Sequence, residues 1–387
     1  MLLGGPTKLK RIPLDSYPAE LALTRDGQVL LGSLRPARLE CRNLNGALVW
    51  QHGLRSYRHS YGVPFTLRVD RHDKVWVCEG AELVGIDTRG NLIRRIQIEL
   101  LQHEHIGTFA LVDGGFVVAA YRSDGVELTP RLLRLDSGGT VLWERQLTTG
   151  PVAYRGIIEV QFPSGESRPV PPWRPKTWQP NPRAPLLVGC DLVVAGYTDM
   201  PASGIGVRYG LSLETGEVLW TTSSGPFHEA AVAGSDRMLI GLQGYGAFET
   251  QLYERTGHVC SWRTHGQYVV DGAGDIRVIE QDNSKRSGCL VRLRDEGHIV
   301  RGDEIPGYYT SRPVLADDGR IAFWREDTLY SADDHLAVKR LCRAEGFASE
   351  LVLTEGGLLV FPLVSRDEKR STELCLFQSD LRPPAAT

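Results

Sequence analysis

One short pattern returns along the whole chain and limits what the chain can fold into. Its clearest copy is the segment 211–220, Leu-Ser-Leu-Glu-Thr-Gly-Glu-Val-Leu-Trp, a strand followed by a Thr-Gly turn and a second strand that ends on Trp220. Related turns recur roughly every 40 residues, with one longer gap. Internal repeats of this length indicate an architecture in which each copy is one supersecondary unit.

The copies share a turn and, shortly after it, a large side chain. The turns lie at 43–46, 87–90, 136–139, 214–216, 254–257, 294–297 and, in a degenerate form, 334–335, and the side chains that follow them are Trp50, Arg94, Trp143, Trp220, Trp262 and Arg301. A second turn with Gly or Asp stands upstream of each copy and is followed by a β-rich run. Short strands between such turns indicate antiparallel hairpins, and four strands in about 40–45 residues is the spacing of a propeller blade.

The copies also predict how the ring closes. Eight copies of the first three strands begin near residues 21, 66, 108, 185, 229, 268, 313 and 349. The last copy, 349–378, has no fourth strand, whereas the strand-like segment 8–14 has no blade. We therefore predict an all-β fold, one β-propeller domain over 1–387 with eight four-stranded blades, closed by the N-terminal strand. Seven blades is the alternative if one weak copy is misread.

Two copies resemble a known family. Segments 213–220 and 135–143, which end in Gly-Glu-Val-Leu-Trp and Gly-Thr-Val-Leu-Trp, resemble the PQQ-like propeller repeat of quinoprotein dehydrogenases and BamB-type scaffold proteins. Segment 64–76 is similar, more weakly, to NHL-type and streptogramin-lyase-like propellers. The resemblance implies that the repeat tryptophans pack between neighbouring blades. It assigns no function, because one fold carries many.

The cysteines bear on cofactor and compartment. The family's PQQ enzymes are secreted and typically use a vicinal cysteine pair, whereas this sequence has no Cys-Cys pair. We therefore do not expect PQQ or its calcium ion, and the cofactor is left unknown. The seven cysteines are scattered, none stands in a Cys-x-x-Cys pair, and the N-terminus lacks a signal-peptide pattern. These features favour reduced thiols in a cytoplasmic protein.

Charge and hydropathy argue against two classes of partner. The formal net charge is -3, whereas non-specific nucleic-acid binding needs a large basic surface. No apolar run approaches the roughly 18 residues of a membrane span. We therefore expect neither a nucleic acid nor a membrane as partner.

The connections from the outer strand of one blade to the inner strand of the next lie on one face of a propeller, around the channel mouth. We place them at 15–20, 52–65, 99–107, 148–184, 222–228, 263–267, 303–312 and 343–348. They hold the histidines His52, His59, His103, His105, His228 and His265. Loops positioned by a rigid ring commonly carry function, so we predict a site for a small molecule or peptide at this mouth.

Histidine titrates near neutral pH, and tyrosine and arginine orient anionic or aromatic ligands. The candidate catalytic residues are His59, His103, His105, His228 and His265, of which at least three are expected to converge around the axis. The candidate ligand-binding residues are Tyr57, Arg58, Tyr61, Glu104, Arg155, Phe227, Glu229, Tyr268, Tyr308, Tyr309 and Arg312. His103 and His105 are candidate ligands of a divalent metal. The plainer interpretation is that these loop residues are simply solvated.

A proline-rich loop, 149–184, is inserted between the predicted blades 3 and 4. Its proline-rich part, 163–185, also carries Trp173 and Trp178. Because proline fixes φ, we expect an extended, largely non-helical segment. It is either a lid or docking arm for a protein partner, or a cover on the outer surface of those blades.

Two classes of function stay open. One is an enzyme of the lyase, hydrolase or cyclase type, with acid/base or metal-assisted chemistry at the mouth. The other is a non-catalytic scaffold that binds a protein or peptide on the same face. A mouth with converging histidines favours the enzyme, and a flat face with an exposed arm favours the scaffold.

Overall fold

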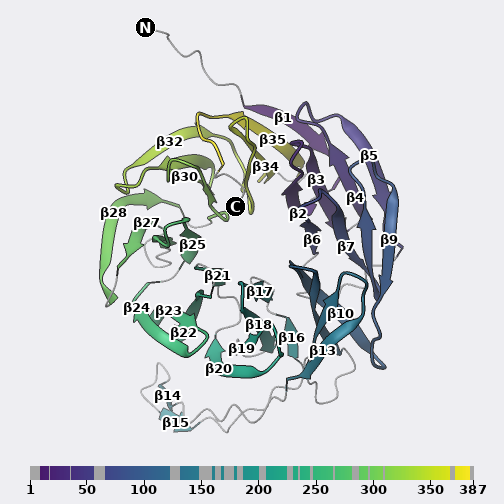
Figure 1. The fold of residues 1–387 in the computed structure, drawn as a ribbon. Helices are drawn as coiled ribbons and strands as arrows, with labels where there is room; N and C mark the ends of the chain where they lie inside the picture. The colour runs from purple at the N-terminus through teal and green to yellow at the C-terminus, as the bar shows by residue number, and fades with distance from the viewer. Residues whose placement is uncertain are drawn as a thin grey trace.

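The computed structural model describes residues 9–383 except 17, 35, 56–65, 123–130, 148–158, 162–166, 170–177, 181–185, 200–205, 225–229, 234–235, 245–246, 265, 281–286, 295–296, 308–309 and 367–370. The strands form a ring of eight antiparallel blades around a central channel (Figure 1). The predicted all-β, eight-bladed propeller is confirmed, and the seven-bladed alternative is wrong.

Each blade runs from an inner strand at the channel to an outer strand at the circumference (Figure 1). The first four blades are β2 (Pro18–Leu23), β3 (Val29–Leu34), β4 (Ala37–Arg42) and β5 (Leu48–Gly53); β6 (Leu67–Val69), β7 (Val75–Glu79), β8 (Glu82–Ile86) and β9 (Leu92–Gln97); β10 (Glu104–Val112), β11 (Gly115–Arg122), β12 (Arg131–Asp136) and β13 (Val141–Gln146); and β17 (Leu186–Val188), β18 (Leu192–Asp199), β19 (Gly206–Ser212) and β20 (Val218–Ser224).

The other half of the ring repeats the same up-and-down order. Its blades are β21 (Ala230–Val232), β22 (Met238–Gly244), β23 (Ala247–Glu254) and β24 (Gly257–Trp262); β25 (Gly266–Val270), β26 (Ile276–Glu280), β27 (Ser287–Leu293) and β28 (Ile299–Pro306); β29 (Val314–Leu315), β30 (Ile321–Arg325), β31 (Thr328–Ala332) and β32 (Val338–Arg343); and β33 (Val352–Leu353), β34 (Leu358–Val364), β35 (Thr372–Gln378) and β1 (Lys10–Leu14).

The ring closes through the N-terminal strand, as predicted. β1 pairs antiparallel with β35, so it is the outer strand of blade 8, and Pro13 takes an edge position opposite Glu373. The same strand also touches blade 1. The Lys10 ammonium donates a hydrogen bond of 2.9 Å to the Asn45 carbonyl, and Ile12 packs over Gly46. The first and last parts of the chain are therefore locked together by a ladder and by side-chain packing.

The hydrophobic core is divided among the junctions between blades. The described residues form eight core clusters, and each cluster combines side chains of two neighbouring blades. At the closing junction, Leu21 and Val29 of blade 1 pack with Val360 and Leu374 of blade 8. Stability therefore comes mainly from blade against blade, because an isolated four-stranded sheet has no second layer to bury its faces.

The repeat tryptophans connect each outer strand to the next blade. The indole N–H groups of Trp50, Trp143, Trp220 and Trp262 donate hydrogen bonds of 2.7–2.8 Å to carbonyls at the turn between the third and fourth strands of the following blade. In blade 2, Arg94 donates to the corresponding turn carbonyls of blade 3. Trp262 is buried, the other three are half-buried, and all four pack against the core cluster of their junction. The predicted packing between blades is confirmed.

A β-bulge and a turn glycine make this contact possible. In blades 1 to 7 the pairing of the two outermost strands shifts by one residue, and in blades 1 to 4 the shift comes directly before the large side chain, Trp50, Arg94, Trp143 or Trp220. Gly90, at φ 87°, lies directly under Trp50, and a Cβ there would come within 2.8 Å of the indole ring. Only glycine combines that backbone conformation with so close an approach.

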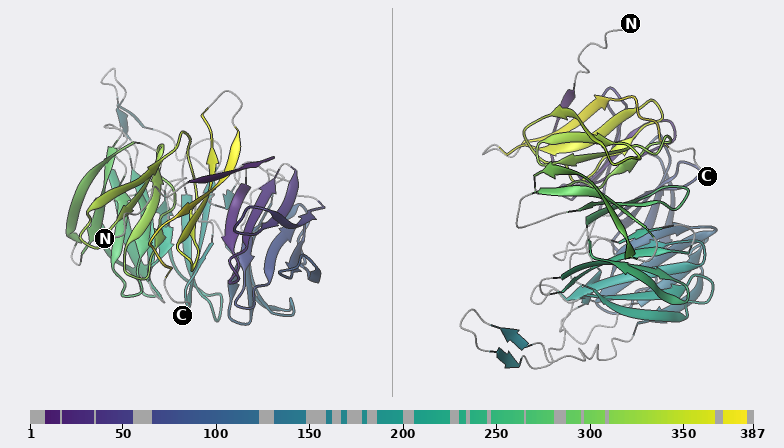
Figure 2. Two further views of the ribbon diagram at one scale, coloured as in Figure 1. Left: turned by 90° about the horizontal axis from the view of Figure 1, so that it is seen from above. Right: turned by 90° about the vertical axis from the view of Figure 1, so that its left-hand side faces the viewer.

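The inserted loop is partly described. β14 (Glu159–Gln161) and β15 (Ser167–Pro169) form a short hairpin that lies outside the ring (Figures 1 and 2). β16 (Trp178–Pro180) pairs with β18 beyond the end of β17, so it extends the inner strand of blade 4. The far end of the loop is thus part of a blade.

Candidate functional site

One repeat position next to the inner strand holds a charged residue in three of the blades where the structure describes it. The turn between the first and second strands of a blade begins at a residue whose N–H bonds to the carbonyl four residues later, such as Thr24 or Thr354. The position lies four residues before that residue. In blades 1, 2, 6, 7 and 8 this position is Glu20, Thr66, Gln267, Arg312 and Glu350. The position is at the start of the inner strand, next to the incoming connection, and therefore at the predicted mouth.

Glu350 connects three blades at this position. One of its carboxylate oxygens accepts a hydrogen bond of 3.0 Å from the backbone N–H of Leu21 in blade 1. The other lies 3.5 Å from the Arg312 guanidinium of blade 7. The Glu350 side chain is 21% exposed and that of Arg312 is 53% exposed. The carboxylate is therefore recessed, and the guanidinium faces solvent.

Glu20 repeats the arrangement one blade further on. It accepts a hydrogen bond of 2.5 Å from the backbone N–H of Leu67 in blade 2 and pairs at 2.5 Å with the Arg68 guanidinium. The Glu20 side chain is 14% exposed and that of Arg68 is 36% exposed. Arg312, Glu350, Glu20 and Arg68, here called the mouth cluster, thus come from four consecutive blades, 7, 8, 1 and 2.

The two carboxylates of the mouth cluster resist ionisation. Burial is the largest influence and raises the pKa of Glu350 to about 7, against the attraction of Arg312 and with a further contribution from the charge of Glu20. Burial also raises the pKa of Glu20, although Arg68 and the Leu67 N–H favour the charged form. Two carboxylates that interact in this way titrate as a pair. The cluster can therefore hold or release a proton near neutral pH.

Glu280, another buried glutamate, shows what the mouth carboxylates lack. Burial opposes its ionisation too, but hydrogen bonds from Arg301, Cys289 and Thr264 outweigh burial and lower the pKa of Glu280. The Thr264 hydroxyl donates to it at 2.9 Å, and the Arg301 guanidinium is in direct contact. Glu280 is thus fixed as an anion within blade 6, whereas Glu350 is not.

The predicted residues 103–105 are described, and one of them is used inside blade 3. The Glu104 carboxylate is buried, forms a bidentate pair with Arg131 at 2.5 and 2.9 Å, and accepts a hydrogen bond from the Leu101 N–H. His103 is exposed at φ 63°, and the His105 ring lies 5.9 Å from the Tyr121 ring. Because β10 begins at residue 104, Glu104 and His105 belong to the inner strand and not to the predicted connection 99–107.

Two more predicted residues lie on inner-strand positions of the mouth. Arg312 belongs to the mouth cluster. The Tyr268 hydroxyl lies 3.0 Å from the Thr250 hydroxyl, which donates to the Thr264 carbonyl, so Tyr268 helps to join blades 5 and 6. Among the residues that the structure describes, no three His, Cys, Asp or Glu side chains gather closely enough to hold a metal ion.

The remaining predicted residues lie outside the described part of the chain. They are Tyr57, Arg58, His59, Tyr61, Arg155, Phe227, His228, Glu229, His265, Tyr308 and Tyr309. The convergence of three histidines therefore stays a prediction.

Sequence reasoning missed Glu20, Arg68 and Glu350. Arg68 and Glu350 lie outside the predicted connections, whereas Glu20 is the last residue of the connection 15–20 and was not among the candidates. A usable signal was present: counting back from the first turn places Glu20 and Glu350 on the same repeat position as Arg312. A charged residue at the channel end of an otherwise apolar strand indicates a position that faces the channel or a neighbouring blade.

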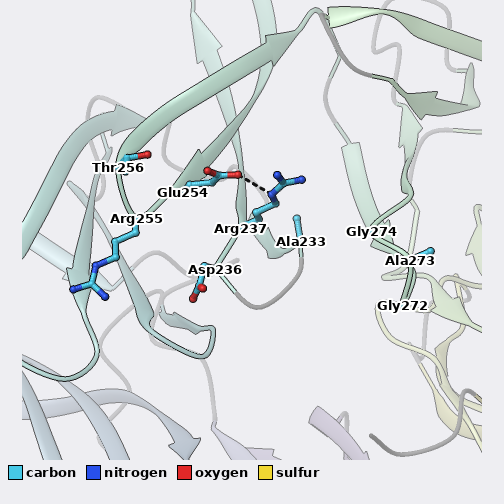
Figure 3. A pocket seen from close by; sticks show the side chains of 9 residues that line it. All are labelled: Ala233, Asp236, Arg237, Glu254, Arg255, Thr256, Gly272, Ala273 and Gly274. Carbon is cyan, nitrogen blue, oxygen red and sulfur yellow. Dashed lines mark hydrogen bonds and ion pairs between the residues drawn. The ribbon is translucent and has the colours of Figure 1, made fainter.

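The opposite face has a pocket of another kind. A pocket of about 540 Å³ lies among the turns of blades 5 and 6, with Arg237 and Glu254 on one side and Gly272 and Gly274 on the other (Figure 3). The Arg237–Glu254 ion pair, at 2.7 Å, is 58% and 32% exposed. An ion pair this open to water adds little to the stability of the fold.

Comparison of the structure finds similar solved proteins, whereas comparison of the sequence finds no match. No family model matches the sequence, and no curated protein matches it. The structure is similar to BamB from Moraxella catarrhalis, with a TM-score of 0.57 and 14% identity over 95% of this chain and 98% of that one. It is also similar to quinohemoprotein alcohol dehydrogenase from Comamonas testosteroni, with a TM-score of 0.60 and 10% identity over 98% of this chain and 78% of that one.

A third likeness is to the Pan2 WD40 domain of Neurospora crassa, with a TM-score of 0.51 and 10% identity over 95% of this chain and 91% of that one. The predicted resemblance to the BamB and PQQ-like propellers is confirmed as a fold. At these identities the likeness carries no activity to this chain. In the described residues, no helix is long and apolar enough to span a membrane.

Proposed function

We propose that this protein is a ligand-binding propeller whose site is the channel mouth at blades 7, 8, 1 and 2. The observation that carries the proposal is the mouth cluster, in which two exposed guanidiniums form ion pairs with two less exposed carboxylates. Charged groups at a concave site with shifted pKa values are a common mark of function. The ligand is a small molecule or a peptide segment narrow enough to enter the mouth.

The cluster also supports an enzyme of the acid/base type. A carboxyl group with a pKa of about 7 can donate or accept a proton at working pH, which is what a lyase, hydrolase or cyclase requires. The mouth histidines His59, His228 and His265 would assist it, and His103 and His105 stay candidates for a divalent metal. We place this activity in the cytoplasm, on the cysteine pattern.

A non-catalytic scaffold is the second candidate, and a separate observation favours it. The outer strands of blades 1 to 3 expose apolar pairs: Leu48 with Val49, Leu92 with Ile93, and Val141 with Leu142. Together they place side chains that are 45–57% exposed on three neighbouring edges. Exposed apolar surface of this kind is typical of protein contacts, and the 163–185 loop would add to such a surface.

A thermal-shift screen tests the mouth site without assuming the ligand. Acidic, neutral and basic metabolites and short peptides are added to the wild type, to Arg312→Gln and to Arg343→Gln. Arg343 pairs with Asp327 on the outer strand of blade 7, so its substitution removes the same charge far from the channel. A mouth ligand should raise the melting temperature of the wild type and the control but not of Arg312→Gln. Ligands that stabilise all three proteins equally would contradict the proposal.

Compounds that bind are then incubated with the protein and examined for turnover. Conversion that Glu350→Gln abolishes supports the enzyme, and binding without conversion supports the scaffold.

A further inference from the structure

Building on the proposed mouth site, we propose that its ligand carries a carboxylate group and that binding takes one proton from solvent onto the Glu350–Glu20 pair. The guanidiniums of Arg312 and Arg68 would hold the ligand carboxylate. The proton adds to one glutamate oxygen, so the charge that the ligand brings is balanced. No bond other than this O–H bond is formed.

The choice of a carboxylate rests on how the two arginines are placed. Arg312 and Arg68 reach the mouth from blades 7 and 2, on either side of the two glutamates, and their side chains are 53% and 36% exposed. A guanidinium has five N–H donors, so it can bond a ligand while it keeps its glutamate contact. Its planar fork matches a carboxylate, which it binds with two parallel hydrogen bonds.

Hydrogen bonds fix Glu350 and Glu20 close to the two arginines, so a ligand carboxylate bound to those arginines would change the pKa of the glutamates. Each accepts a backbone N–H of the next blade's inner strand, Leu21 for Glu350 and Leu67 for Glu20, so neither can swing away without breaking that bond. The charged groups facing Glu350 are Arg312 from blade 7, Glu20 from blade 1 and Arg68 from blade 2. A new anion beside these arginines weakens their hold on the glutamate negative charge, which favours the protonated form.

The affinity for the ligand should therefore fall as the pH rises. Free Glu350 has a pKa of about 7, raised by burial, and the bound ligand raises that pKa further. Below pH 7 the proton is already present, so the affinity is highest there and nearly constant. Above pH 7 each ligand takes up as much as one proton, and the affinity falls by up to about tenfold per pH unit. The decline ends above the pKa of the complex.

Isothermal titration calorimetry tests this with two probes, succinate for a small acid and a tri-glutamate peptide for a peptide source. The full-length protein is titrated at pH 6, 7 and 8, in HEPES and in Tris at pH 8. We expect at least one probe to bind up to about fivefold more weakly at pH 8 than at pH 7, because the free pair is about half protonated at pH 7. Its heat at pH 8 should differ between HEPES and Tris by the difference between the ionisation enthalpies of the two buffers, multiplied by an uptake of about one proton.

Variants separate the possible failures. Glu350→Gln keeps an acceptor for the Leu21 N–H and should bind with no buffer dependence and with less change between pH 7 and 8. Arg312→Gln should lose about tenfold or more in affinity, whereas the control Arg343→Gln should not. Circular dichroism and melting curves establish that each variant is folded.

Binding without proton uptake would overturn the inference and leave the mouth site standing. The same holds if neither probe binds while neutral or basic compounds give Arg312-dependent thermal shifts. Probe binding that Arg312→Gln leaves unchanged would instead overturn the mouth site itself.

Discussion

The outer rim and the inner rim of the ring are built on opposite principles. At the outer rim the same contact returns from blade to blade: a bulged strand, a large side chain and a glycine turn of the next blade. At the inner rim one repeat position changes from blade to blade, and Glu20 and Glu350 at this position form ion pairs with arginines of neighbouring blades, at blades 7, 8, 1 and 2. The contacts that repeat from blade to blade stabilise the ring, whereas the residues that differ from blade to blade give the channel mouth its chemical character.

The largest loss of stability is expected at blade 8, where the N-terminal strand β1 pairs with the C-terminal strand β35. Deleting residues 1–14 removes β1, its ladder to β35 and the contacts of Ile12 and Leu14 with the closing core cluster. The loss should be roughly 4–6 kcal/mol, from two apolar side chains and an exposed sheet edge. Chemical denaturation measures it. Should the deleted protein be insoluble, Ile12→Ala is the milder variant, and an unchanged unfolding midpoint in both would contradict this closure.

The next effect belongs to a rim tryptophan. Trp220→Ala removes a ring that lies 4.5 Å from the Tyr253 ring and the hydrogen bond that its indole N–H donates to the Glu254 carbonyl. Because Trp220 is half-buried, we expect about 3 kcal/mol, the lower end of large-to-small core substitutions. Denaturant unfolding checks this value. A cost under about 1 kcal/mol would mean that the outer contact does not hold neighbouring blades together.

Two turn glycines separate the contribution of the tryptophan contact from that of the turn conformation. Gly90 and Gly114 both have positive φ, but a Cβ on Gly90 meets the Trp50 ring at 2.8 Å, whereas one on Gly114 meets nothing within 4 Å. Gly90→Ala should therefore cost about 2–4 kcal/mol, from the backbone and from the clash. Gly114→Ala should cost about 1–2 kcal/mol, from the backbone alone. Equal losses in unfolding experiments would show that Gly90 is needed only for its turn.

These rim contacts explain why the fold could be predicted. Turn glycines, the Trp that follows them and the missing fourth strand of the last copy are local patterns, readable wherever they occur. The closing pair of β1 and β35 followed from counting strands. The boundary of β10 was missed, because His103, Glu104 and His105 look like loop residues in the sequence, although the strand begins at Glu104.

The mouth cluster could not be predicted in the same way. The contact between Glu350 and the Leu21 N–H joins residues 329 positions apart, and it exists only because the ring closes in one register. Residue type alone did not separate Glu350, which is recessed beside Glu20, from Glu280, which is held by three donors. Burial and partners decide the difference, and both belong to the folded ring.

The smallest effect is expected at the inner rim, and it depends on pH. The pKa of Glu350 is raised from 4.5 to about 7, so its contribution to stability is present below pH 4.5 and is lost as the pH rises through 7. Glu350→Gln stays neutral, so it should equal the wild type near pH 4.5 and exceed it at pH 8. The full shift corresponds to about 3 kcal/mol, and we expect about 2 kcal/mol because the side chain is partly exposed and coupled to Glu20.

Glu280→Gln is the matched control with the opposite sign. The pKa of Glu280 is lowered, so its charged form stabilises the fold above pH 4.5 and that contribution is lost as the pH falls. Glu280→Gln should therefore be less stable than the wild type at pH 7 and approach it on acidification. Denaturant unfolding of the three proteins from pH 4.5 to 8 measures both differences. If the two glutamine variants follow the same pH dependence, the inner rim at blades 8 and 1 does not differ from an ordinary buried ion pair.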